Sequence, residues 1–197
     1  MFRSIESILR AYRSQSHLTE APAPPDTDER LAVPVASLVV GYETAATVSK
    51  HYGTQDPWEL AEHFGLRVQS QENPPDARPG DRIRSAYLDN PPTAVLYRGP
   101  LEELADLIYL HRPNLSVDLL SLHLACVLFQ HLERTGMTSI SDPLGTIAPA
   151  PEAKAAARIG RLTQYATGLA AYAFAQALMG LSFFPADLDA LYPPQHA

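Results

Sequence analysis

Cysteine is almost absent from this chain of 197 residues, since Cys126 is the only one. A single cysteine excludes an intrachain disulfide. Because Cys126 lies in an apolar stretch, we predict that it packs as a small buried hydrophobe, and we expect a protein of a reducing, cytoplasmic compartment.

Clusters of positive charge are also missing. The net charge is -7, and no run of lysine or arginine occurs. A nucleic-acid surface needs such cations to replace the counterions that binding releases. We therefore expect no direct contact with nucleic acid. The length suits one domain with a real core better than two.

Uninterrupted apolar runs of the targeting kind are lacking too. The first residues mix charged with apolar side chains and have no continuous apolar region, so we do not expect a signal peptide. Between Arg161 and Asp187 there is no formally charged residue. That stretch still contains Gln164, Thr167, Gln176 and Ser182, so we predict a buried helix and no membrane span.

We predict three regions along the chain. Residues 1–15 form an amphipathic helix, residues 16–37 a linker rich in proline and acidic residues, and residues 38–192 the folded domain. The apolar face of the first helix consists of Phe2, Ile5, Ile8, Leu9 and Tyr12. It either binds a partner or packs back on its own domain.

The stretch from Leu119 to Glu133, LLSLHLACVLFQHLE, is apolar on nearly every face at helical spacing. A helix of this kind must be buried. We predict that it spans 116–135, with Ser116 or Asn114 as its cap, and that Gly136 ends it.

The remaining pattern predicts an α+β fold that is mostly helical, with a small sheet preceding the buried central helix. Asp56 and Pro57 open a short helix, because an aspartate cap followed by proline suits a helix start. Strands are expected at 66–68, 84–88 and 94–97, and further helices at 100–111 and 152–181, with Gly160 and Gly168 as candidate breaks in the latter.

Four segments, in order, resemble the ImmA/IrrE-like zinc metallopeptidases. DPWELAEHFGLRV is similar to the family's opening helix and strand, and IRSAYLDNPPTAVLYRG to the two strands that follow. LLSLHLACVLFQHLE stands in the place of the active-site helix, which in the family reads roughly Ala-His-Glu-Leu-Gly-His. AAYAFAQALMGLSFFP is similar to a later helix. The resemblance covers about 42–185 and implies a zincin-like minimal fold.

In that family two histidines at i and i+4 bind zinc, the glutamate after the first is the general base, and a glutamate of the later helix is the third ligand. The resemblance places Cys126 at the first ligand position, Val127 at the base, Gln130 at the second ligand and Ala170 at the third. No matched position keeps the family's side chain. The resemblance therefore implies a degenerate site without a catalytic residue or cofactor.

Three functions follow as hypotheses. The first is a catalytically silent ImmA/IrrE-like domain, a protein-binding regulatory module of stress response or repressor control, whose partner is a transcriptional repressor or its regulator. The second is an active zinc metallo-endopeptidase that cleaves a helix-turn-helix repressor with displaced ligands, for which His123, Cys126 and His131 are the weak alternative set. His131 lies roughly 80° round the helix from His123, a poor geometry for one tetrahedral ion. The third is an unrelated helical interaction module.

Overall fold

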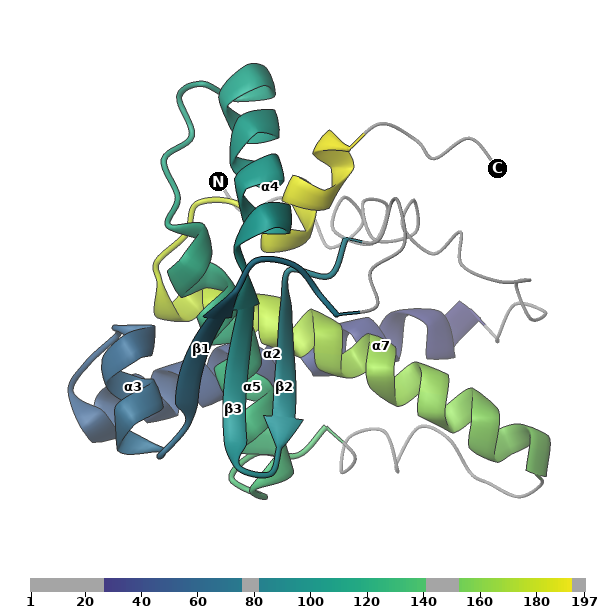
Figure 1. Ribbon diagram of the computed structural model, residues 1–197. Coiled ribbons are helices and arrows are strands. Elements are labelled where there is room, and N and C mark those ends of the chain that lie inside the picture. Colours follow the sequence, from purple (N-terminus) through teal and green to yellow (C-terminus); the bar gives the residue numbers. More distant parts are fainter. Residues whose placement is uncertain (1–26, 76–81, 141–152, 193–197) are drawn as a thin grey trace.

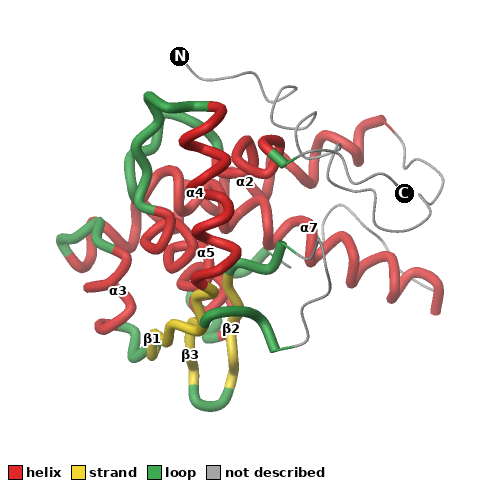
Figure 2. Tube along the Cα trace, turned by 45° about the horizontal axis from the view of Figure 1, so that its top comes forward, coloured by secondary structure: helices red, strands yellow, loops and turns green. Residues whose placement is uncertain are grey.

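A small sheet lies against one side of a central helix, and two long helices lie behind it (Figure 1). The computed structural model describes residues 27–75, 82–140 and 153–192. In Figure 2 the three strands sit at one edge of the molecule, and helices make up most of the rest of the described chain. The fold is α+β and mostly helical, as predicted.

The elements follow one another in a simple order. They are α2 Thr27–Tyr52, α3 Pro57–His63, β1 Arg67–Gln71, β2 Ser85–Asp89, β3 Pro92–Tyr97, α4 Arg98–His111, α5 Leu119–Arg134, α7 Ala153–Leu178 and the 3-10 helix η1 Pro185–Leu191. The three predicted strands are confirmed, with slightly different ends.

Helix α2 extends into the segment predicted as a linker. It starts at Thr27, so residues 27–37 of that linker are helical, and the domain boundary at residue 38 stays a prediction. The helix also contains Pro34, which removes one backbone hydrogen bond. Val33 and Leu38 are buried in the core, and this tertiary packing outweighs the local preference against a helix.

The sheet has the strand order β1-β3-β2. Strand β1 runs parallel to β3, and β2 runs antiparallel to it in a hairpin that pairs Tyr87 with Ala94. The central strand β3 is buried from Thr93 to Tyr97. The Tyr97 N–H donates to the Arg84 carbonyl at 2.9 Å, which fixes the backbone of Arg84 just before β2.

Helix α5 is the predicted central helix, and β2, β3 and α7 pack against it. Its cap is Asp118, whose Oδ1 accepts from the N–H groups of Leu120 and Ser121, so the prediction of Ser116 or Asn114 is wrong. The predicted start lies too early because the chain before Asp118 is not helical. Gly136 follows the end of the helix with a φ of 74°.

Helix α7 is continuous, so Gly160 and Gly168 do not divide it. It packs chiefly along α2, where the Tyr42 hydroxyl donates to Gln176 Oε1 at 2.6 Å. A Cβ added at Gly41 would collide with the Ala170 carbonyl oxygen, so the two backbones lie very close. No helix of the described residues is long and apolar enough to cross a membrane.

Candidate functional site

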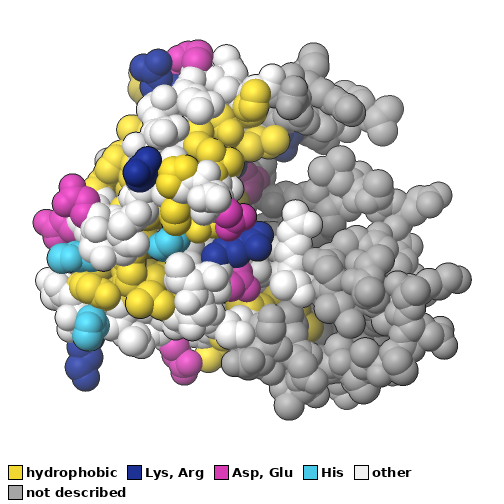
Figure 3. All heavy atoms as spheres, turned by 60° about the horizontal axis from the view of Figure 1, so that its bottom comes forward, with side chains coloured by type: hydrophobic (Ala, Val, Ile, Leu, Met, Phe, Trp, Pro, Cys, Tyr) yellow, Lys and Arg dark blue, Asp and Glu magenta, His cyan; other side chains and the backbone are white. Residues whose placement is uncertain are grey.

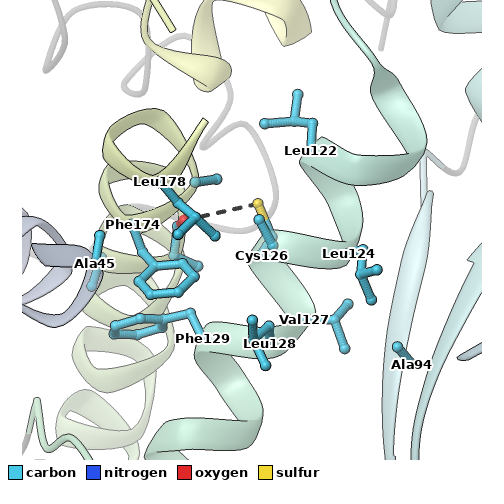
Figure 4. Packing of buried hydrophobic residues seen from close by; sticks show 14 of the residues in the cluster. Ala45, Ala94, Leu122, Leu124, Cys126, Val127, Leu128, Phe129, Phe174 and Leu178 are labelled. Carbon is cyan, nitrogen blue, oxygen red and sulfur yellow. Dashed lines mark hydrogen bonds between the residues drawn. The ribbon is translucent and has the colours of Figure 1, made fainter. Parts of the chain in front are cut away.

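The first matched position, Cys126, lies on the face of α5 that meets α7. Its thiol points at the Ala171 carbonyl oxygen, with Sγ 3.9 Å from that oxygen (Figure 4). Cys126 is buried, as predicted. Burial raises the pKa of the thiol to about 12, and the negative charge of Asp189 adds to the shift. The sulfur therefore stays protonated and acts as a small core side chain.

Val127, at the position of the base, faces the other way. In Figure 4 its side chain points toward the sheet, on the side of Ala94, while Cys126 points toward α7. Both Val127 and Ala94 belong to the main hydrophobic core and are almost fully buried. The two positions therefore do not face a common pocket.

Apolar packing also surrounds the third ligand position. Ala170 is fully buried, and its carbonyl oxygen lies against Gly41 of α2. Next to it, Phe129 of α5 and Phe174 of α7 bring their ring centroids to 5.7 Å. Gln130 is half-buried and is the one polar amide among the four matched positions. The space around Ala170 is thus filled by apolar side chains of α5 and α7.

His131, one of the three alternative metal ligands, makes structural hydrogen bonds on another side of α5 from Cys126. His131 bonds with both ring nitrogens: Nδ1 is 3.1 Å from the Tyr87 hydroxyl and Nε2 is 3.2 Å from the Phe64 carbonyl oxygen. Since a carbonyl can only accept, Nε2 carries the proton and Nδ1 accepts from Tyr87. His131 therefore ties α5 to β2 and to the end of α3, whereas Cys126 faces α7.

His123 is buried as well. Burial lowers the pKa of its imidazole to about 3, helped by the positive charge of Arg84. A neutral imidazole is able to bind a metal in principle. Among the residues that the structure describes, however, no three histidine, cysteine, aspartate or glutamate side chains form a group that could hold a metal ion.

Sequence reasoning missed a buried ion pair beside these residues. Arg84, which precedes β2, is 6% exposed and donates from Nη1 to Oδ1 of Asp189 in η1. The Tyr172 hydroxyl of α7 donates to the other oxygen of Asp189 at 3.1 Å. Burial alone would lower the pKa of Arg84, but the charge of Asp189 and its bond outweigh it, so the pKa is raised.

This ion pair supplies fixed charges that act on α5. The charge of Arg84 contributes to the low pKa of His123, and Asp189 contributes to the high pKa of Cys126. We call Arg84, Asp189, Tyr172 and Tyr192 the arginine cluster. It joins the segment before β2, α7 and the C-terminal 3-10 helix next to the degenerate positions.

The predicted partner-binding residues Phe2, Ile5, Ile8, Leu9 and Tyr12 lie outside the described residues, so their role stays a prediction. Comparisons with protein-family models, curated proteins and solved structures find no match to this chain. Membership of the ImmA/IrrE-like family likewise stays a prediction that rests on the sequence motifs.

Proposed function

We propose that this chain is a catalytically silent ImmA/IrrE-like domain with a zincin-like minimal fold, acting as a cytoplasmic protein-binding regulatory module. Its partner is a transcriptional repressor or the regulator of one. One observation carries the proposal: Val127 and Ala170, at the positions of the base and the third ligand, are 1% and 0% exposed within the apolar core.

The chemistry explains why this observation matters. A catalytic zinc needs three protein ligands and a water that a nearby base can deprotonate. An isopropyl group takes no proton, and Val127 points at the sheet, away from the surface that Cys126 shares with α7. The small sheet before α5 also supports the likeness, because an unrelated helical module has no need of it.

Exposed apolar side chains support a role in protein binding. At the end of α4, Tyr109 is 80% and Leu110 is 70% exposed, and Figure 1 shows this end of α4 projecting beyond the sheet. Figure 3 shows hydrophobic side chains gathered in a band over part of the described surface. Large exposed apolar groups that lie together mark interaction surfaces.

The test combines metal content with binding. The purified protein is assayed for zinc and mixed with a helix-turn-helix repressor, with and without added zinc. We expect a complex with intact repressor, and no change in melting temperature on chelation. One equivalent of zinc, with a loss of stability on chelation or cleavage of the repressor, would replace this proposal with the displaced-ligand peptidase.

The binding surface is tested separately. Replacing Tyr109→Ser together with Leu110→Ser should weaken the complex about tenfold or more, because two large apolar groups leave the interface. Ala105→Ser, on an exposed position of the same helix, is the matched control and should leave the affinity unchanged. Equal affinities for the double variant and the parent would exclude the end of α4 as the binding surface.

A further inference from the structure

Three buried polar atoms of the arginine cluster have no hydrogen-bond partner among the described residues. They are Nε and Nη2 of Arg84 and the hydroxyl oxygen of Tyr192. Buried donors of this kind are nearly always satisfied in folded proteins. A guanidinium that uses one nitrogen and leaves two buried ones open indicates a partner that the described residues do not supply.

The two open nitrogens lie on the same edge of the guanidinium. Nη1, on the end of the group, donates to Asp189, whereas Nε–H and the outer N–H of Nη2 point side by side from the other edge. Two parallel donors match two oxygens of one carboxylate or one phosphate. The free edge therefore has the geometry of a bidentate oxyanion site.

The surroundings hold that edge in place. The Arg84 carbonyl accepts from the Tyr97 N–H at 2.9 Å, which anchors the backbone to β3. Asp189, which binds Nη1, is itself oriented by the Tyr172 hydroxyl at 3.1 Å. A donor fixed from both sides is preorganised, so little conformational freedom is lost when a ligand binds.

A second cation lies beside the pair of Arg84 and Asp189. The guanidinium carbons of Arg82 and Arg84 lie 4.3 Å and 5.1 Å from the ring centroid of Tyr192. Two cations thus share one aromatic ring. The cluster is shallow, because the Asp189 side chain is 13% exposed and the neighbouring Ile83 is 47% exposed.

We propose that the Nε and Nη2 edge of Arg84, together with the Tyr192 hydroxyl, binds an oxyanion that presents two adjacent oxygens, a carboxylate or a phosphate group. The site lies on the segment before β2 and on the chain after η1, so it stands whether or not α5 is catalytically silent. It gives the chain a second means of recognition beside its apolar surface.

The experiment titrates the full chain with acetate and, separately, with inorganic phosphate at constant ionic strength. Binding is followed by melting temperature and by the nitrogen-15 signal of the Arg84 Nε–H group, which Arg84→Lys assigns by deleting it. We expect a saturable shift of that signal with at least one of the two anions, and the stronger of the two identifies the ligand class.

Two variants and a control make the result specific. Arg84→Lys keeps the charge beside Asp189 but loses the paired donors, so affinity should fall about tenfold or more. Tyr192→Phe removes one hydroxyl only and should weaken binding severalfold with an unchanged fold. Arg98→Lys is the control, because Arg98 is a surface cation whose side chain is 58% exposed and whose Nη2 lies 3.0 Å from Glu72.

Some outcomes would overturn the proposal. An Nε–H signal that neither anion moves would mean that the open donors hold water only. A rise in melting temperature with the anion that Tyr192→Phe and Arg84→Lys leave as large as in the parent would mean that the anion binds elsewhere. If Arg84→Lys fails to fold, the response of the parent and of Tyr192→Phe still decides the question.

Discussion

Phe129 shows how one side chain joins the central helix to its neighbour. Its ring is fully buried, 5.7 Å from that of Phe174, and both residues belong with Leu122 to the main hydrophobic core. Replacing Phe129 with Ala should lower the free energy of unfolding by about 3 to 5 kcal/mol, because the cavity cannot close between two long helices. Urea unfolding measures this.

The matched control is an aromatic residue on the surface. Tyr109→Ala changes an 80% exposed side chain and should alter the free energy of unfolding by about 0.5 kcal/mol or less. A loss below about 1 kcal/mol for Phe129→Ala would mean that the contact between α5 and α7 is less tight than the ring distance indicates.

His123 makes stability depend on pH. Its folded pKa is about 3, below the unfolded value of 6.5, because burial and Arg84 disfavour the charged ring. The unfolded chain therefore binds a proton that the folded chain does not, and stability falls as pH drops below 6.5. Between pH 7 and pH 5 we expect a loss of about 2 kcal/mol from this residue.

Two variants separate the contribution of His123 to the pH dependence of stability from the contributions of other titratable groups. His123→Gln should show a smaller loss between pH 7 and pH 5 than the parent, whatever its absolute stability, in urea unfolding at both pH values. His111→Gln changes an exposed histidine and should keep the parent's dependence. The assignment to His123 is wrong if all three proteins lose the same stability.

Single residues differ in how far the sequence reveals them. The buried role of Cys126 could be predicted, because its neighbours at helical spacing are apolar. The bond between Arg84 and Asp189 could not, since the two residues are 105 positions apart and each alone resembles an ordinary polar residue of a strand or turn. Only the fold brings them together.

At the scale of single elements, the cap of α5 makes a local test. Asp118 accepts from the Leu120 and Ser121 N–H groups at 3.0 Å and 3.1 Å, and its other oxygen accepts from the Ser121 hydroxyl at 2.6 Å. Asp118→Ala should cost about 1 kcal/mol of unfolding free energy, because two N–H groups at the helix start lose their acceptor.

The control for Asp118→Ala is a substitution at Ser116, one of the two cap positions predicted from the sequence. Ser116→Ala should leave the melting temperature nearly unchanged, because Ser116 is exposed and lies before the helix. Asp118→Asn keeps an acceptor and should cost less than Asp118→Ala. A greater loss for Ser116→Ala than for Asp118→Ala would restore the predicted cap.

Gly41 tests the contact between α2 and α7. In an isolated helix, Gly→Ala is favourable by about 1 kcal/mol. Here an added Cβ would meet the Ala170 carbonyl oxygen, and Ala173 Cβ at 2.8 Å, so Gly41→Ala should destabilise the protein. Thermal unfolding measures the change in stability. Ala46→Gly, at an exposed position of the same helix, is the control for helix propensity alone. A Gly41→Ala variant more stable than the parent would contradict the close packing.

Elements with strong local signals were predictable. The Asp56 carboxylate caps α3 at 2.9 Å from the Trp58 N–H, and the hairpin of β2 and β3 forms where proline and asparagine interrupt two apolar runs. The start of α2 and the continuity of α7 were not predictable. The first depends on the burial of Val33 and Leu38, which compensates for Pro34, and the second on the packing of α7 along α2.

At the scale of the whole molecule, the class and the order of the elements followed from periodicity and spacing. The four resembling segments fall on α3 and β1, on the hairpin, on α5 and on α7 with the start of η1, in that order. Periodicity says which face of a helix is buried, but not which helix covers it. For this reason the packing of α2 on α7 and the arginine cluster appear only in three dimensions.

The pairing of α2 with α7 has a consequence for synthesis on the ribosome. Tyr42 and Gln176, which bond across this contact, are 134 residues apart, so at 5 to 20 residues per second α2 waits roughly 7 to 27 s for its main partner. A fragment that ends at residue 140 should lack cooperative unfolding and be cut rapidly by protease. During that wait the apolar face of α2 is open to chaperones, and the nascent chain is most vulnerable just before its last long helix emerges.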